Sequence, residues 1–181
     1  MPHLNLRFPE AGDTGSLVEA VRESLPELLP WMPWCHAGYS AADAAQFIAS
    51  RPAAREAWDA FDFVVVGAHG KLLGLCGINT INRENRFAKL GYWVRTSERG
   101  RGVAAGAVGL LARWVFEHTD LGRLEIVAAV SNKASQRVAE KAGALHEGTL
   151  RSRVCIHGAM HDAHLFSLIR PQPEDGPAGA P

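Results

Sequence analysis

The chain has 181 residues, of which 19 are Lys or Arg and 19 are Asp or Glu, so its formal net charge is zero. This length suits one domain with a sizeable core, and 47% hydrophobic with 21% charged residues is typical of a folded protein. Zero net charge excludes a general attraction to nucleic acid or an anionic membrane, and no stretch approaches the roughly 18 apolar residues of a membrane span. We expect no direct partnership with nucleic acid or a membrane.

The first half of the chain predicts three strands and two helices. In chain order, we expect a strand over 4–8, a helix over 13–29, a helix over 41–50, and a hairpin of strands over 61–68 and 72–79. Alternating or continuous apolar runs indicate the strands, and apolar residues at helical spacing indicate the helices. Ser40 is a candidate N-cap for the second helix.

The second half alternates strands and helices before a final hairpin. We expect a strand over 87–95, a helix over 102–118, a strand over 124–130, a helix over 133–142, and strands over 145–155 and 161–169. Gly143 is a candidate left-handed cap after the last helix. Residues 171–181 contain Pro and Gly but no large apolar side chain, so they predict a flexible tail after a single domain over 1–170.

Cysteines and histidines form neither a disulfide framework nor a metal site in this sequence. The chain contains three widely spaced cysteines: Cys35, Cys76 and Cys155. They form no CxxC pair, so we expect reduced thiols in a cytoplasmic protein. His157, His161 and His164 lie near Asp162, but on a hairpin strand residues 161 and 164 would point to opposite faces. We therefore predict no metal.

A glycine-rich segment lies between the strand over 87–95 and the helix over 102–118. It reads Arg99-Gly100-Arg101-Gly102-Val103-Ala104-Ala105. Glycines let backbone N–H groups approach an anion, and the first turn of a helix adds unpaired donors and a partial positive charge. Arg99 and Arg101 add full charges. The segment therefore predicts a phosphate or pyrophosphate site.

A dinucleotide is one candidate ligand for this segment. Gly100, Gly102 and Ala105 match the G-x-G-x-x-[GA] pattern of dinucleotide-binding folds. However, residues 96–99 separate the strand from the glycines, and the next strand ends in Ala129-Val130-Ser131-Asn132 without the acid that would hold a ribose. Both features count against a dinucleotide-binding redox domain.

Further motifs accompany the loop in a fixed order. They are Leu29-Pro30-Trp31-Met32-Pro33-Trp34, Gly91-Tyr92-Trp93-Val94, Arg99-x-x-Gly102-x-Ala104, Asn132-x-x-Ser135-x-x-Val138-Ala139-Glu140-Lys141-x-Gly143, and Glu147-Gly148-x-Leu150-Arg151 followed by Asp162. Over about residues 4–170 this series resembles the GNAT superfamily of N-acyltransferases, in the branch of RimJ- and RimL-type ribosomal-protein N-terminal acetyltransferases. The resemblance implies an α+β (α/β) fold with a mixed, mostly antiparallel central sheet, splayed at the coenzyme A site and flanked by helices.

The resemblance also implies where acetyl-CoA binds. The implied cofactor-binding residues are Trp93, Val94, Arg95, Arg99, Gly100, Arg101, Gly102, Val103, Ala104, Ala105, Asn132, Ser135 and Lys141. The backbone of the first three would receive the pantetheine arm, and N–H groups of the glycine loop would hold the pyrophosphate. Asn132 would bond the pantetheine arm, and Ser135 would stand near the sulfur. Trp31 and Trp34 are candidates either for acceptor binding or for the core.

Acyl transfer from a thioester needs a neutral amine, a polarised carbonyl and a stabilised leaving thiolate. Ser135 is the candidate catalytic acid. Some GNAT enzymes carry a glutamate on one of the splayed strands, but the matching positions here hold Ala88 and Val127. Because an α-amine has a pKa of about 8 and a lysine amine one of about 10.4, this favours α-amines or other weakly basic amines. The candidate bases acting through water are Glu84, Glu147 and His36.

The sequence therefore predicts an N-acetyltransferase that moves an acetyl group from acetyl-CoA to a primary amine by direct attack in a ternary complex. The acceptor is expected to be a protein or peptide α-amine or a small amine, and a homodimer is a further expectation. One alternative is a longer acyl donor such as succinyl-CoA, because no side chain selects the acyl group. The other is a non-catalytic acyl-CoA-binding module.

Overall fold

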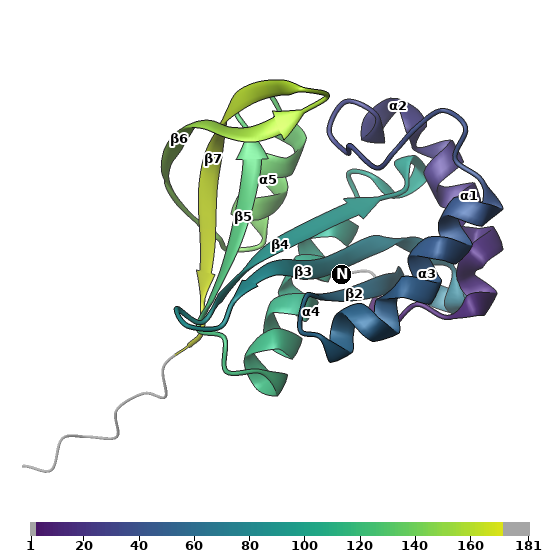
Figure 1. Ribbon diagram of the computed structural model, residues 1–181, viewed down its shortest axis with the longest axis horizontal. Helices are drawn as coiled ribbons and strands as arrows, with labels where there is room; N and C mark the ends of the chain where they lie inside the picture. Colours follow the sequence, from purple (N-terminus) through teal and green to yellow (C-terminus); the bar gives the residue numbers. More distant parts are fainter. Residues whose placement is uncertain (1–2, 172–181) are drawn as a thin grey trace, which may run out of the picture.

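The computed structural model describes residues 3–171, which form a twisted sheet with helices on both faces (Figure 1). The strands are β1 (Asn5–Arg7), β2 (Ala60–Val66), β3 (Leu72–Asn82), β4 (Phe87–Val94), β5 (Arg123–Ala129), β6 (Leu145–Ile156) and β7 (Ala159–Ile169). The helices are α1 (Thr14–Glu23), α2 (Leu25–Leu28), α3 (Ala41–Glu56), α4 (Val103–His118) and α5 (Lys133–Lys141), with short 3-10 turns η1 (Ala11–Asp13), η2 (Ala68–Gly70) and η3 (Thr96–Glu98). The tail predicted over 171–181 lies outside the described residues, apart from Pro171. None of the helices over 3–171 combines the length and the apolar character needed to cross a membrane.

The strands form one sheet in the order β1-β2-β3-β4-β5-β7-β6, and only the β4–β5 pair is parallel. The predicted mixed, mostly antiparallel sheet is therefore confirmed. β4 pairs with β5 only over residues 87–89 and 123–125. Beyond that point the two strands diverge into a V (Figure 1), which leaves backbone groups on both facing edges without a neighbouring strand.

Two apolar cores hold the helices to opposite faces of the sheet. α1 and α3 pack on one face through a core that contains Leu17 and Ile48. α4 packs on the other face through Val108 and Leu111, and α5 joins that core through Ala139. Full burial of a Leu, Val or Ile side chain contributes roughly 1.5–3 kcal/mol. Both helix layers are therefore fixed to the strands that frame the V.

The helix predicted over 13–29 is wrong in its extent. α1 ends at Glu23, and after Ser24 the separate helix α2 begins at Leu25. Pro26 has no N–H to donate to the Arg22 carbonyl, so a continuous helix would lose a hydrogen bond there. The break matters for the site, because it brings α2 close to the glycine loop.

The boundaries of α3 and α5 test the predicted caps. Ser40 forms a capping box with Asp43, as predicted, but α3 continues past Ser50 to Glu56. Gly143 has a φ of 84°, which confirms the predicted left-handed residue after α5.

The β6–β7 hairpin reaches across the open end of the V to the segment after α2 (Figure 1). Its turn residues His157 and Gly158 have φ of 49° and 80°, as a tight hairpin turn with two left-handed residues requires. His157 Nε2 lies 2.6 Å from the carbonyl oxygen of Leu29. The two halves of the molecule are thus bonded at the hairpin tip as well as at the base of the V.

Candidate active site

The splayed edge of β4 offers alternate backbone groups to the gap. Arg95 donates its N–H to the carbonyl oxygen of Leu73 on β3 at 2.8 Å. Because hydrogen-bonded and non-bonded pairs alternate along antiparallel strands, Trp93 also turns its backbone toward β3. Tyr92 and Val94 turn theirs toward the gap. Trp93, Val94 and Arg95 were expected to receive pantetheine through their backbone. Of these three, only Val94 has backbone N–H and C=O groups that face the gap, and those of Tyr92 face it as well.

The glycine loop borders a cavity of about 760 Å³, here named the glycine-loop cavity. Gly100 and Gly102 have φ of 74° and 80°, a conformation that favours glycine. Gly102 precedes α4 without a side-chain cap, so N–H groups of the first turn have no partner within the helix. The predicted residues that line this cavity are Trp31, Trp93, Val94, Arg99, Gly100, Gly102, Val103, Ala104, Ala105, Asn132, Ser135 and Lys141.

Acidic residues of α1 and α2 hold the segment that leads into the glycine loop. The buried Arg95 side chain pairs with Glu19 at 2.6 Å. Arg99 pairs with Glu27 of α2 at 2.9 Å, so its charge is already partly compensated. Neither Arg95 nor Arg101 lines the glycine-loop cavity. The arginines of this segment therefore position the loop more than they supply free charge.

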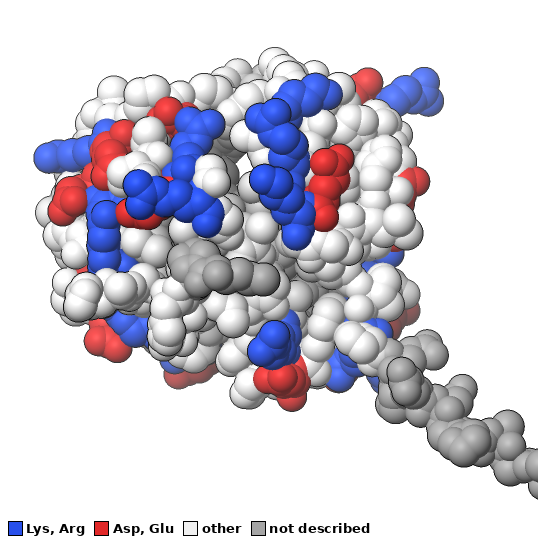
Figure 2. All heavy atoms as spheres, turned by 180° about the vertical axis from the view of Figure 1, so that it is seen from behind, with Lys and Arg blue, Asp and Glu red and all other residues white. Residues whose placement is uncertain are grey.

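Basic side chains of α5 face the glycine loop from the other side of the cavity. Arg137 and Lys141 line it, and neither has an acidic partner among residues 3–171. Seen from behind, basic side chains gather on both sides of a hollow (Figure 2). Such a pair suits phosphate groups. Arg137 was not predicted from the sequence, although its i,i+4 spacing from Lys141 places both on one helix face.

A cluster of three polar side chains lies where α5 begins. Asn132 caps the helix, and its side-chain oxygen accepts from the Ser135 N–H at 3.1 Å. The Tyr92 hydroxyl donates to the Ser135 carbonyl oxygen at 2.8 Å and lies 3.0 Å from the Ser135 Oγ. Burial raises the pKa of Tyr92 to about 12, so the phenol stays neutral and keeps its proton. The contacts of the Tyr92 hydroxyl therefore hold Ser135 next to the splayed edge of β4.

A second cavity, of about 790 Å³, extends over the α1–α3 face of the sheet and is here named the large cavity. Trp34, 44% exposed, lines it with its ring 6.1 Å from that of Trp93. The residues that line both cavities are Trp31, Met32, Tyr92, Trp93, Asn132 and Ser135. The two cavities therefore meet at the Tyr92–Ser135 pair.

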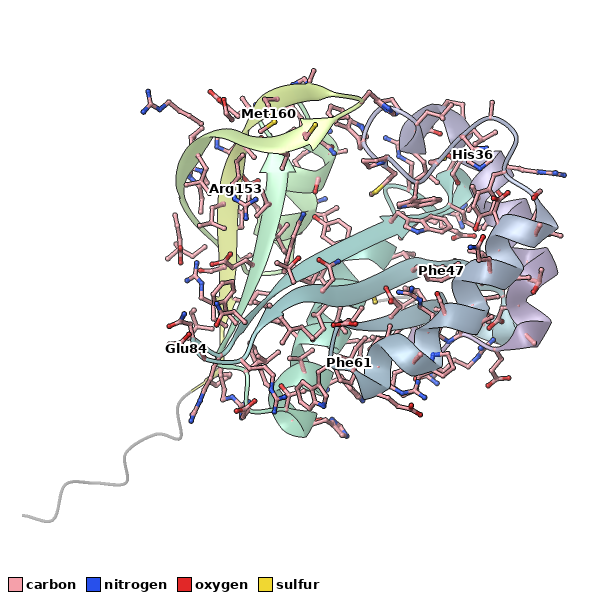
Figure 3. All side chains as sticks on the ribbon, in the orientation of Figure 1. His36, Phe47, Phe61, Glu84, Arg153 and Met160 are labelled. Atoms are coloured by element: carbon pink, nitrogen blue, oxygen red, sulfur yellow. The ribbon has the colours of Figure 1, made fainter. Side chains whose placement is uncertain are left out.

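The three candidate bases lie outside both cavities. Glu147 accepts hydrogen bonds from Arg123 and Ser167, and these contacts hold its pKa at about 2. The carboxylate is therefore committed to a structural ion pair, which argues against Glu147 among the candidate bases. His36 lies in the loop before α3, and Glu84 lies in the β3–β4 turn at the closed end of the V (Figure 3). Neither position reaches the junction of the cavities.

The histidines and cysteines make other contacts. In the described range 3–171, no three His, Cys, Asp or Glu side chains converge as a metal site requires. His164 Nδ1 lies 3.1 Å from His146 Nε2 on the neighbouring strand. The described cysteines are free thiols, and burial raises the pKa of Cys76, which packs as a small apolar side chain.

A splayed mixed sheet with a glycine loop at its opening defines an acyltransferase of the N-acetyltransferase class. The chain belongs to the GNAT acetyltransferase family, since the acetyltransferase (GNAT) domain matches residues 3–145. A Bacillus subtilis (strain 168) protein assigned as the ribosomal N-acetyltransferase YdaF is 29% identical over 170 residues, which covers 93% of this chain and 92% of that protein.

Solved structures share the fold over nearly the whole chain. One, assigned as a ribosomal-protein-serine acetyltransferase from Vibrio cholerae, has a TM-score of 0.81 and 30% identity, and covers 93% of this chain and 95% of its own. The microcin C7 self-immunity acetyltransferase MccE, in complex with acetyl-CoA and AMP, has a TM-score of 0.84 and 22% identity, with 92% of both chains covered. The second likeness shows the fold alone.

Proposed function

We propose that the protein transfers an acetyl group from acetyl-CoA to an α-amine by direct attack in a ternary complex. The observation that carries the proposal is the meeting of two cavities at Tyr92 and Ser135. A donor in the glycine-loop cavity and an acceptor in the large cavity would each bring its reacting group to this junction. The reaction needs that proximity, because bound and aligned reactants avoid the entropic cost of meeting in solution.

Coenzyme A fits the glycine-loop cavity in both charge and backbone geometry. Its pyrophosphate would accept from the unpaired N–H groups at the start of α4. Arg137 and Lys141 would contact its phosphates across the cavity. The amides of pantetheine would bond the free edge of β4 at Tyr92 and Val94, in the place of a missing strand. The complex of MccE with acetyl-CoA on the same fold supports this assignment.

The proposed chemistry breaks the thioester C–S bond and forms an amide C–N bond. The neutral amine attacks the acetyl carbon, a backbone N–H at the β4 edge polarises the carbonyl, and the sulfur leaves. Ser135 Oγ donates a hydrogen bond to the departing sulfur, and water takes up the proton lost by the amine and returns one to the thiolate, so that free CoA leaves as the thiol and Ser135 keeps its proton. Tyr92 is a positioning residue, since its hydroxyl lies 3.0 Å from the Ser135 Oγ and thereby orients it.

An α-amine is the acceptor that this site suits best. The acids lining the large cavity, Asp43 and Asp62, are engaged by Ser40 and Arg51 respectively. An α-amine, with a pKa of about 8, is partly neutral at pH 7 and needs little help from a base. The assignment of YdaF as a ribosomal N-acetyltransferase supports a peptide N-terminus.

CoA release from acetyl-CoA tests the proposal. The acceptors are a lysine-containing peptide with a free N-terminus and the same peptide with a blocked N-terminus. We expect release with the free peptide only, and mass spectrometry should place the acetyl group on the α-nitrogen. A parallel assay with succinyl-CoA reports acyl preference. CoA binding by calorimetry without turnover across a broad panel of amines would instead identify a non-catalytic acyl-CoA-binding module.

A further inference from the structure

Lys89 is a basic side chain in the large cavity that the proposed reaction does not use. It lies on β4 on the same side of the sheet as Gly91 and Trp93, because side chains alternate along a strand. Gly91 has open space where a side chain would stand. The floor of the cavity therefore runs from Trp93 to Lys89 with no side chain between them.

Lys89 has no hydrogen-bond or ion-pair partner among the described residues, although acids lie nearby. Glu125 is its register neighbour on β5, but the Glu125 carboxylate accepts from Arg123 at 2.8 Å. Asp62 also lines the cavity, but it pairs with Arg51 at 2.7 Å. Each of these carboxylates is thus committed to an arginine, and the Lys89 charge is left uncompensated.

A second cation adds to this excess of positive charge. Burial lowers the pKa of Lys89, and nearby Arg153 lowers it further. Arg153 belongs to β6 and lies near β5 and β7 (Figure 3); it is exposed, does not line the large cavity itself, and has no acidic partner over residues 3–171. Two neighbouring cations, one of them partly desolvated, destabilise each other until an anion binds between them.

We propose that Lys89, assisted by Arg153, binds an anionic group of the acceptor, so that the preferred substrates are amines carrying a carboxylate. This inference rests on the proposed function, because it names the class of acceptor used at the same site. Lys89 and Tyr92 are three residues apart on β4, which is about 10 Å at roughly 3.3 Å per residue. An extended peptide spans that distance in about three residues. The carboxylate therefore belongs to the second or third residue, or to the C-terminus of a short peptide.

The same separation gives Lys89 a role in specificity rather than in proton transfer. Along β4, Leu90 and Gly91 separate Lys89 from Tyr92, at whose contact with Ser135 the amine is proposed to react. Removal of the charge should therefore change which acceptor is used and leave the use of uncharged acceptors intact.

Paired acceptors test the inference. The first pair is a peptide amide with Asp or Asn at its third position, and the second pair is triglycine or triglycinamide. These two pairs distinguish a side-chain carboxylate from a terminal one. We expect the wild-type protein to use the acidic member of at least one pair with about 10-fold higher kcat/KM, an advantage that shrinks at high salt. Lys89→Met should remove the advantage while kcat/KM for the neutral members is kept.

Arg113→Met is the matched control, since it removes one positive charge from α4 outside both cavities. It should keep the acidic preference. Equal use of both members by the wild-type protein, or a preference that survives Lys89→Met, would overturn the inference while leaving acetyl transfer established.

A binding measurement tests, without turnover, whether Lys89 binds a carboxylate of the acceptor. N-acetyl-triglycine and its amide are titrated calorimetrically into wild-type and Lys89→Met protein. Tighter binding of the acid to the wild-type protein alone supports the inference, and equal binding of acid and amide overturns it. Absence of CoA release from every acceptor would count against the proposed function and would not alter this result.

Discussion

The glycine-loop cavity takes most of its lining from the glycine loop and α5, whereas the large cavity takes short runs of residues from many elements. The glycine loop and α5 supply most of the first, through backbone N–H groups and two cations on one helix face. The second takes residues from the segment after α2 and from α3, β2, β3, β4, β5 and β6. Backbone donors suit one fixed ligand, whereas the partly exposed side chains of the large cavity, such as Trp34 and Lys89, can differ without a change in the core.

The two ligands of the proposed reaction would therefore be recognised by largely separate sets of residues. The cavities share only the residues around Tyr92 and Ser135. Substitutions in one cavity should therefore change one ligand's affinity, and substitutions at the junction should change turnover instead.

The largest effect is expected from Gly102→Val in the glycine loop. A non-glycine residue at a φ of 80° costs about 1–2 kcal/mol, and a shifted loop would lose charge-assisted bonds of about 1.5–3 kcal/mol each. CoA affinity should fall by at least about 100-fold, as measured by calorimetry. The control is Gly70→Val, which has a φ of 75° but lies in η2, outside both cavities. Unchanged CoA affinity in folded Gly102→Val protein would refute the phosphate site.

A smaller effect is expected at the junction. Ser135→Ala should lower kcat by roughly 10-fold to 100-fold, because it removes one hydrogen bond to the charged leaving sulfur, with CoA affinity nearly unchanged. Tyr92→Phe should lower kcat by less, because it removes only the group that orients Ser135. If Tyr92 acts through Ser135, the double variant will match Ser135→Ala. Additive losses would show that Tyr92 acts independently, and full activity in Ser135→Ala would show that the sulfur leaves without this hydrogen bond.

The smallest effect is expected from Trp34→Ala in the large cavity. Aromatic pairs contribute about 0.5–1.5 kcal/mol, and Trp34 packs near Trp93 and Tyr39. The KM for the acceptor should rise several-fold, and CoA affinity should stay constant. Trp34→Phe should recover most of the loss. A change in CoA affinity with no change in acceptor KM would show that Trp34 does not serve the acceptor.

Local signals allowed much of the fold to be predicted. The glycine loop, the Ser40 cap and the left-handed Gly143 each depend on a few neighbouring residues. Helix start and stop signals use only such local residues, so the sequence was enough to predict them. The break between α1 and α2 was missed because the leucine spacing continues through Pro26. Because Pro26 has no backbone N–H, the helix breaks there although the leucine spacing continues.

The site was less accessible from sequence because its contacts join distant segments. Tyr92 and Ser135 are 43 residues apart, and nothing local to either residue indicates their hydrogen bond. Glu147 was a candidate base until the structure showed its pairing with Arg123, 24 residues earlier. The role proposed for Lys89 has no local signal either, because its lack of a partner depends on the pairing of Glu125 with Arg123 and of Asp62 with Arg51.

The bond between His157 and Leu29 turns the open V into a closed ring. The strands meet at residues 87–89 and 123–125 on one side of this ring, and the hairpin tip completes it on the other. The large cavity borders the α3 side of the ring, and the glycine-loop cavity borders the α4–α5 side. A donor and an acceptor bound in the two cavities, as proposed, would therefore approach the Tyr92–Ser135 pair from opposite sides of this ring.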